Sequence, residues 1–263
     1  MYYTLFKYLL VLPISRFCFR PWIEGEQNIP AAGGVVLAGN HLSSGETFLL
    51  PAMVRRPMTF PAKAELFRGD RGWQSKVLAW FLRAVGQVPL DRSGGPASSE
   101  SLRPVLDVLR RGGMVGIFPE GTRSPDGRLY KGRTGVARLA LGAGVPVVPV
   151  GFFDTRMEPG PFGIPWMTRP GIVIGTPLRL DGTPRPGEDE HAVMRRVTDE
   201  VMAAIRVCEW SEMTPTWSRP STMRRSRVRE PCRPAHQTSW PWVSPSWRCA
   251  PARRRVGASS PSG

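Results

Sequence analysis

Apolar positions along this chain follow two spacings in turn, and their alternation predicts strands separated by helices. Short apolar runs indicate buried strands, which are predicted at residues 34–38, 86–90, 114–118, 145–152 and 171–175. Apolar residues at i, i+3, i+4 and i+7 indicate a helix that is capped by Ser98 or Ser99 and stopped at Gly112. Further helices are predicted at 47–52, 135–141 and 191–207.

This order of elements predicts the fold class. Strands that alternate with helices form a largely parallel central sheet flanked by helices, which is an α/β fold. The first 209 residues hold nearly all of the aliphatic side chains and are long enough to bury one large core. We therefore expect one domain over residues 22–209, preceded by a segment of residues 1–21 and followed by a tail of residues 210–263.

Residues 1–21 are apolar and aromatic but are interrupted by charge and proline. Lys7, Pro13 and Arg16 break the run, which is then too short to span about 30 Å of hydrocarbon. The segment also lacks the small-residue cleavage site of a signal peptide. Aromatic residues suit lipid headgroups and basic residues suit anionic lipid, so we expect an N-terminal interfacial segment at a membrane surface. A core helix packed on the domain is the alternative.

Residues 60–85 crowd large apolar side chains among basic ones, and two interpretations fit this mixture. A headgroup interface or an acyl-chain groove would use both kinds of side chain. A buried core with a charged outer surface would have the same composition.

The tail differs in composition from the rest of the chain. Residues 210–263 carry ten arginines, no lysine and two acidic residues, and so contribute +8 to the net charge of +15. They contain no leucine, isoleucine or phenylalanine, so they cannot bury enough apolar surface and are expected to be disordered. The tail is either a tether to anionic lipid or nucleic acid, or the product of a shifted reading frame in a GC-rich gene. We favour the second interpretation, and we expect no site there and no specific nucleic-acid partner.

Candidate chemistry begins where the first predicted strand ends. The stretch Asn40-His41-Leu42-Ser43-Ser44-Gly45-Glu46 places a histidine and a carboxylate five residues apart. A neutral histidine is a suitable general base for a hydroxyl nucleophile, and Glu46 would hold one ring nitrogen while the other stays free. Five residues turn through about 500° on an ideal helix, so the two side chains meet only if the turn departs from helical geometry. Taken alone, the same residues are more typical of a structural histidine and a solvated acid in a first turn.

A second candidate site is rich in positive charge. Arg92 follows the predicted strand 86–90, and Arg123 follows the predicted strand 114–118 through a turn at Gly121. An arginine fork matches phosphate oxygens, so both residues are candidates for binding a phosphate-bearing ligand. Thr122 would add a hydroxyl donor, and Gly121 would permit a tight turn with positive φ.

Two further charged residues lie near this turn. Glu120 is a candidate salt-bridge partner that would hold Arg92 or Arg123 in place. Lys131 is typical of a solvated loop. The chain has 36 lysines and arginines, so any one of them taken singly is by default a surface residue.

Four blocks in this order and spacing resemble the glycerolipid acyltransferase family, especially its bacterial lysophosphatidic acid acyltransferases. The blocks are residues 40–46, 86–92 (GQVPLDR), 118–124 (FPEGTRS) and 145–150 (VPVVPV). The resemblance runs from about Trp22 to Pro177, and the four blocks together are much more specific than any one of them. One position departs from the pattern, because the usual His-x4-Asp reads His41-x4-Glu46 here, with a side chain one methylene longer.

The resemblance implies an enzyme that moves a fatty acyl chain from a coenzyme A or acyl carrier protein thioester to the free hydroxyl of lysophosphatidic acid, giving phosphatidic acid. It implies catalytic roles for His41 and Glu46. Acceptor binding is implied for Arg92, Glu120, Gly121, Thr122 and Arg123, with Glu120 and Gly121 shaping the acceptor pocket as the alternative to a salt bridge of Glu120. Lys131 lies where the family often has a basic residue, which makes it a weaker candidate for binding a phosphate or coenzyme A. The thioester is a co-substrate and no other cofactor is expected, while the membrane-lipid acceptor implies a peripheral or monotopic protein at the cytoplasmic face of the cell membrane. The alternatives are a different lysolipid acceptor, or a basic protein that binds membranes and anionic lipid without catalysis.

Other chemistries have no support in the sequence. The four cysteines have no C-x2-C spacing and no paired histidines, so neither a metal site nor a disulfide framework is expected. The chain has no Walker motif, no G-x-G-x-x-G and no G-x-S-x-G elbow. We therefore expect direct transfer without a covalent intermediate.

Overall fold

The computed structural model describes residues 2–90, 102–160 and 165–210, all within one contact unit, Met1–Thr216. The helices are α1 (Tyr2–Phe6), α2 (Leu12–Ile14), α3 (Glu46–Met53), α4 (Trp73–Ala84), α6 (Arg103–Arg110), α7 (Gly135–Ala143) and α8 (Glu190–Trp210). Shorter helical turns are η1 (Lys7–Val11), η2 (Ser15–Phe19), η3 (Glu26–Asn28) and η4 (Ala64–Phe67). The strands are β1 (Trp22–Glu24), β2 (Val35–Gly39), β3 (Met58–Thr59), β4 (Pro61–Lys63), β5 (Val88–Leu90), β6 (Met114–Ile117), β7 (Val147–Phe153), β8 (Glu158–Pro159), β9 (Pro165–Trp166) and β10 (Gly171–Ile174).

Six of these strands form the central sheet, in the order β1-β10-β7-β2-β6-β3. β2 pairs in parallel with both β6 and β7, and β3 pairs in parallel with β6. β1 and β10 are also parallel, whereas β10 and β7 are antiparallel. The predicted α/β fold with a largely parallel sheet is therefore confirmed.

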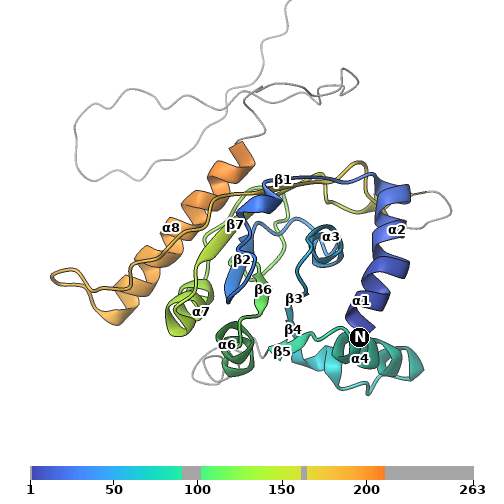
Figure 1. Cartoon of the computed structure of the whole chain (residues 1–263), viewed down its shortest axis with the longest axis horizontal. Coiled ribbons are helices and arrows are strands. Elements are labelled where there is room, and N and C mark those ends of the chain that lie inside the picture. Colours follow the sequence, from blue (N-terminus) through green and yellow to red (C-terminus); the bar gives the residue numbers. More distant parts are fainter. Residues whose placement is uncertain (1, 91–101, 161–164, 211–263) are drawn as a thin grey trace, which may run out of the picture. The chain divides into compact units, whose positions relative to one another are not determined.

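The central strand β2 shows why the sheet is covered on both faces. All five of its residues, Val35–Gly39, are buried, as is typical of a parallel strand with helices on either side. Val35 and Leu37 pack in a core with α3, while Val36 and Ala38 pack in a second core with α6, α7 and α8. Figure 1 shows the same arrangement, with α3 on one side of β2 and with α7 and α8 on the other.

Most predicted elements correspond to observed ones within a few residues. The strand predicted at 86–90 contains β5, which pairs with β4 in a separate two-stranded sheet instead of joining the central one. The apolar face of the helix predicted before Gly112 matches α6, in which Val105 and Leu109 are buried. Its predicted cap, Ser98 or Ser99, lies outside the described residues, as does the tail beyond residue 210.

The N-terminal segment is helical from Tyr2 to Phe19. It packs on α4, which lies within residues 60–85, the region for which the sequence allowed two interpretations. The Phe6 ring makes edge contacts with the rings of Trp80 and Phe81 in α4, at centroid distances of 6.2 and 5.4 Å. Figure 1 shows α1 next to α4 and α2 beyond α3 from the sheet. Among the described residues, no helix has both the length and the apolar character needed to cross a membrane.

Candidate active site

The candidate residues gather at the edge of the sheet where β2, β6 and β7 end. His41 follows β2, Glu120 follows β6 and Thr155 follows β7. Because the three strands are parallel, their carboxyl ends meet at one edge, which is where open α/β sheets bind ligands.

His41 and Glu46 form the centre of this site. The His41 Nδ1 atom lies 2.6 Å from Glu46 Oε2, and an ionised carboxylate only accepts hydrogen bonds, so Nδ1 carries the proton. In the neutral imidazole, the Nε2 atom then has a free lone pair. The His41 side chain is 16% exposed and that of Glu46 is 0% exposed. This arrangement gives a partly accessible base whose tautomer is fixed from inside the protein.

The turn between the two residues explains how side chains five positions apart can meet. α3 begins only at Glu46, so residues 40–45 form a non-helical turn ahead of the helix. The backbone N–H groups of Leu42 and Ser43 donate to Glu46 Oε1 at 3.1 and 2.7 Å. The same carboxylate therefore closes the turn and orients the histidine.

Glu46 is a buried carboxylate with hydrogen-bond donors on both of its oxygens. Besides the two backbone amides, Oε1 accepts a hydrogen bond from the hydroxyl of Thr155, and Oε2 faces His41. A buried charge without such donors would destabilise the fold by several kcal/mol. Its place in the first turn of α3 adds a favourable interaction with the helix dipole. Glu46 is therefore held in a single position.

Phe118 and Asn40 fix the surroundings of the imidazole. The rings of His41 and Phe118 stack with their centroids 4.0 Å apart and their planes at 11°. The buried Asn40 side chain donates to the Phe152 carbonyl at 3.1 Å and accepts from the Phe152 N–H at 2.7 Å. These bonds tie the turn after β2 to β7, so the position of His41 depends on both neighbouring strands.

Glu120 joins two loops. One of its carboxylate oxygens accepts the His41 N–H at 3.0 Å, and the other accepts the Tyr130 N–H at 2.9 Å. The Ser124 N–H donates in turn to the His41 carbonyl at 2.7 Å. Within the part of the chain that the structure describes, Glu120 forms no ion pair, so the salt bridge to Arg123 considered from sequence is wrong. Burial raises the pKa of the Glu120 carboxyl, and the backbone hydrogen bonds from Tyr130 and His41 oppose the rise.

Gly121 occupies a position that requires glycine. Its φ is +74°, and a Cβ atom there would lie only 2.7 Å from Nε of Arg133. The Arg133 N–H donates to the Pro119 carbonyl at 2.7 Å. The Arg133 guanidinium therefore packs against the turn that leads to Thr122 and Arg123.

Exposed cations surround this turn. Thr122, Arg123 and Lys131 are all exposed, and Arg123 makes no side-chain hydrogen bond or ion pair with any described residue. Arg92 lies outside the described residues, but the strand before it, β5, pairs with β4 so that Leu90 faces Lys63. Lys63 therefore adds an exposed cation beside the segment that leads to Arg92.

Three residues that complete the site were absent from the candidates chosen by sequence: Asn40, Arg133 and Thr155. Asn40 directly precedes His41, and Arg133 lies two residues after Lys131, so both could have been found as sequence neighbours of residues that were already candidates. Thr155 is 109 residues away from Glu46, and no pattern in the sequence connects the two.

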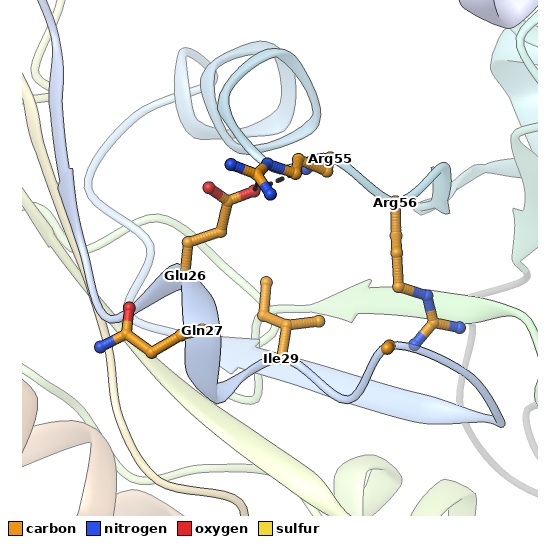
Figure 2. A pocket seen from close by; sticks show the side chains of 6 residues that line it. Glu26, Gln27, Ile29, Arg55 and Arg56 are labelled. Carbon is orange, nitrogen blue, oxygen red and sulfur yellow. Dashed lines mark hydrogen bonds and ion pairs between the residues drawn. The ribbon is translucent and has the colours of Figure 1, made fainter.

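A cavity lies at the opposite edge of the sheet from His41 (Figure 2). It is lined by Glu26, Gln27, Ile29, Ala31, Arg55 and Arg56. Arg56 donates to the carbonyls of Gly33 and Gly112, which precede β2 and β6. Arg55 forms an ion pair with Glu26 at 3.8 Å. Because the amino ends of the parallel strands lie here, this cavity is remote from His41 and has no part in the chemistry described below.

Comparison with known proteins identifies the class that this fold and site define. The sequence model of the acyltransferase family matches residues 20–152, a region that includes His41, Glu46 and Glu120. The chain therefore belongs to the acyltransferase family, and the resemblance found from the four blocks is confirmed.

Several curated proteins similar to this chain are 1-acyl-sn-glycerol-3-phosphate acyltransferases. One from Pseudomonas aeruginosa is 31% identical over 188 residues, which are 70% of this chain and 69% of that protein. One from Bacillus subtilis is 28% identical over 185 residues, 68% of this chain and 84% of that protein. A chloroplast enzyme of Arabidopsis thaliana is 30% identical over 159 residues, 59% of this chain. The match spans only 43% of that plant protein and 37% of a Brassica napus relative.

A solved structure shows the same fold. The crystal structure of the 1-acyl-sn-glycerophosphate (LPA) acyltransferase from Thermotoga maritima superposes with a TM-score of 0.55 and 26% sequence identity. The superposition covers 81% of this chain and 83% of that one. The similarity to bacterial members of the family thus extends from the motifs to the arrangement of helices and strands.

Proposed function

We propose that this protein is a 1-acylglycerol-3-phosphate O-acyltransferase. It would move a fatty acyl chain from a coenzyme A or acyl carrier protein thioester to the free hydroxyl of lysophosphatidic acid. The observation that carries the proposal is the 2.6 Å contact between His41 and Glu46, at the carboxyl edge of the sheet in a member of the acyltransferase family. The names of the bacterial relatives support the choice of acceptor.

His41 acts as the general base in this proposal. Its Nε2 atom takes the proton of the acceptor hydroxyl while the hydroxyl oxygen bonds to the carbonyl carbon of the thioester. The tetrahedral intermediate then collapses, the carbon–sulfur bond breaks, and the proton passes from His41 to the leaving thiolate. Between these steps Glu46 stabilises the imidazolium by charge and keeps the ring in place. The products are phosphatidic acid and a free thiol.

The cationic turn after β6 is the proposed site for the acceptor phosphate. Arg123 is exposed beside the Ser124 N–H that bonds to the His41 carbonyl, so a phosphate held here lies near the base. Thr122 adds a hydroxyl, and a guanidinium fork pairs with phosphate oxygens through two charge-assisted hydrogen bonds. Lys63 in β4 is a further exposed cation, and Arg92 is included in the proposal because of its place in the sequence motif.

The N-terminal helices expose apolar side chains and bury polar ones, which supports attachment to a membrane surface. Leu9 is 71% and Phe17 84% exposed, whereas Lys7 and Ser15 are buried against the domain. The Lys7 ammonium donates to the Val54 carbonyl at the end of α3. A helix that faced water would show the opposite distribution.

Helix α4 continues this exposed surface, because Phe6 links α1 to Trp80 and Phe81. We call the combined surface the apolar face; it consists of Leu5, Tyr8, Leu9, Leu10, Ile14, Phe17, Trp73, Val77, Leu78 and Trp80. Large apolar side chains exposed on neighbouring helices are typical of a membrane or protein interaction site. We propose that it rests in the cytoplasmic leaflet of the cell membrane, where the lipid acceptor and product reside.

Release of thiol that depends on an added acceptor tests the proposed function. The full chain is mixed with an acyl-CoA or an acyl carrier protein thioester, and with lysophosphatidic acid or lysophosphatidylcholine, each in turn. We expect thiol release and phosphatidic acid only when lysophosphatidic acid is present. Binding of the chain to anionic vesicles without thiol release for any pair would instead support a non-catalytic lipid-binding protein.

A further inference from the structure

Thr155 brings a buried hydroxyl to the catalytic site from beyond the region that the family match covers. The match ends at residue 152, and Thr155 lies two residues after the end of β7. The chain turns at Asp154, whose φ is +51°, a conformation that a residue other than glycine keeps only where its surroundings hold it. Thr155 itself is fully buried. The segment after β7 is therefore fixed with the threonine side chain inside the protein.

Thr155 is joined to the turn after β2 by two hydrogen bonds that run in opposite directions. Its hydroxyl donates to Glu46 Oε1, and its backbone carbonyl accepts from the Ser43 hydroxyl at 2.5 Å. The Ser43 N–H donates to the same Glu46 oxygen at 2.7 Å, and the Ser43 Oγ atom accepts the Gly45 N–H at 2.9 Å. Thr155, Ser43 and Glu46 thus form a closed ring of hydrogen bonds, in which the threonine hydroxyl has a fixed acceptor.

The two oxygens of the Glu46 carboxylate have different partners. Oε1 accepts three hydrogen bonds, from the backbone N–H groups of Leu42 and Ser43 and from the Thr155 hydroxyl. Oε2 lies 2.6 Å from Nδ1 of His41. Among the described residues that donate to this carboxylate, only Thr155 comes from outside residues 40–46. Its hydroxyl therefore fixes the carboxylate relative to β7, and with it the direction in which Oε2 points.

We infer that Thr155 is a positioning residue for the catalytic base, which acts through Glu46. Its hydroxyl keeps Oε1 bound inside the protein, so that Oε2 stays opposite Nδ1 of His41 and the proton stays on that nitrogen. This inference rests on the proposed function, because it takes His41 to be the base. Without the hydroxyl the carboxylate turns away, and the imidazole also adopts the tautomer with its proton on Nε2. In that tautomer the nitrogen that must take the acceptor proton is already occupied.

Removal of the hydroxyl tests the inference. The wild type, Thr155→Val, Thr155→Ser and Thr198→Val are assayed with lysophosphatidic acid and palmitoyl-CoA. Thr198 is the matched control, because it is also fully buried but donates its hydroxyl to the Met194 carbonyl of its own helix at 2.7 Å. We expect Thr155→Val to lower kcat by about ten- to a hundredfold and to change each KM by less than about twofold, because the base is misplaced while the substrates still bind. Thr155→Ser, which keeps the hydroxyl, should have a kcat within about threefold of the wild type.

Two outcomes of this assay would overturn the inference. One is a kcat of Thr155→Val equal to that of Thr198→Val. The other is a Thr155→Ser enzyme as slow as Thr155→Val, since the hydroxyl would then not be the acting group. If circular dichroism shows that Thr155→Val is not folded, Thr155→Ala takes its place, because the smaller side chain fits the same space.

A double-mutant cycle tests whether the effect passes through Glu46. In Glu46→Asp the carboxylate ends one methylene closer to α3, so we expect it no longer to reach both His41 and the Thr155 hydroxyl. Thr155→Val should then lower kcat by a factor at least about threefold smaller in the Glu46→Asp background than in the wild type. An equal factor in both backgrounds would contradict action through Glu46.

A further readout does not depend on turnover. The ¹⁵N chemical shifts of the two His41 ring nitrogens, measured at a pH where the imidazole is neutral, show which nitrogen carries the proton. We expect the proton on Nδ1 in the wild type, Thr155→Ser and Thr198→Val, and a mixture of both tautomers in Thr155→Val. If the tautomers behave so but no protein turns over substrate, the proposed function fails while the positioning of His41 by Thr155 stands. If Thr155→Val keeps the proton on Nδ1, the inference fails whatever the activity.

Discussion

Glu46 stands where the family usually has aspartate, and the structure shows what the longer side chain reaches. From the first residue of α3, one carboxylate oxygen accepts hydrogen bonds from two backbone amides and from Thr155, while the other faces His41. A side chain one methylene shorter at the same backbone position has to give up part of this set. The length of the Glu46 side chain therefore matches the positions of its hydrogen-bond partners. Whether glutamate or aspartate suits this position depends on all of these partners together.

Substitution of Glu46 tests this fit. Glu46→Gln keeps the size of the side chain but removes the charge that stabilises the imidazolium, so we expect kcat to fall about a hundredfold or more. Glu46→Asp keeps the charge but reaches fewer partners, so we expect a smaller loss of kcat. Steady-state kinetics of both variants, with circular dichroism to show that each is folded, provide the check. Full activity in Glu46→Gln would show that the carboxylate has no catalytic role.

Replacement of His41 addresses the base itself. His41→Ala should lower kcat by about 10²- to 10⁴-fold, because this is the usual contribution of a general base, and should leave acceptor binding largely unchanged. The matched control is His191→Ala, which alters an exposed histidine on α8. Thiol release from His41→Ala at the wild-type rate would contradict the proposed mechanism.

Among the elements, β5 and β6 are each followed in the sequence by an arginine that we assign to the acceptor phosphate, Arg92 and Arg123. Arg92→Ala and Arg123→Ala should reduce kcat/KM for lysophosphatidic acid by about tenfold to a thousandfold, since each removes a charge-assisted contact. The KM for the thioester should change much less. Arg128→Ala is the control within the same loop, because Arg128 is 85% exposed and pairs with Asp126. An unchanged acceptor KM and kcat in both test variants would remove these arginines from the site.

The elements also show how far the sequence alone could lead. Buried strands such as β2 and amphipathic helices such as α6 were predictable because periodicity records which face of an element is buried. The N-terminal helices were harder, because their apolar side chains point outward and Lys7 points inward, the reverse of the usual rule. Residues 60–85 remained ambiguous for the same reason, since Trp73 and Trp80 are exposed.

The candidate site also has one part that the sequence could predict and one part that it could not. His41 and Glu46 stand in one short block, so their pairing could be considered from sequence, although the geometry of the turn could not. The partner Phe152 lies near the end of β7 and Thr155 follows that strand, and only the parallel pairing of β2 with β7 brings them to the turn. Contacts of this kind depend on strand order, which periodicity does not contain.

For the molecule as a whole, we propose that the apolar face is the surface that attaches to the membrane. Deletion of residues 1–19 should shift the protein from the membrane fraction to the soluble fraction while some activity remains on detergent-dispersed substrate. A milder variant, Leu9→Glu with Phe17→Glu, changes two side chains that are 71% and 84% exposed and should have the same effect without disturbing the core.

Sedimentation with anionic vesicles measures this attachment. Ala203→Glu, an exposed position on α8, controls for the added negative charge. All proteins should be compared with and without residues 211–263, because the ten arginines of the tail can bind lipid by themselves. If the double variant partitions like the Ala203→Glu control in both backgrounds, the apolar face is not the attachment surface.

The pH dependence of stability is a second property of the whole molecule. Burial raises the pKa of the Glu209 carboxyl, near the end of α8, from 4.5 to about 7 in the folded protein, so its protonated form stabilises the fold fully below about pH 4.5. This contribution is lost as the pH rises through about 7. In Glu209→Gln, the decrease in unfolding free energy between pH 5 and pH 8 should be smaller by about 1–2 kcal/mol, a value reduced for the partial exposure of the group. Urea unfolding at the two pH values measures the difference, and equal decreases in variant and wild type would contradict it.

Because the Glu120 carboxylate accepts hydrogen bonds from two backbone amides, we expect one local opening motion to expose both amides to solvent. His41 and Tyr130 donate their N–H groups to the two oxygens of one side chain, so neither amide meets bulk water unless that side chain moves. Hydrogen exchange at the two amides should therefore report one cooperative unit, although 88 residues separate them in the sequence. A ligand that binds only to the turn after Glu120 and stabilises it would then also slow hydrogen exchange at the His41 amide. Binding of the substrate at that turn would therefore order the catalytic base.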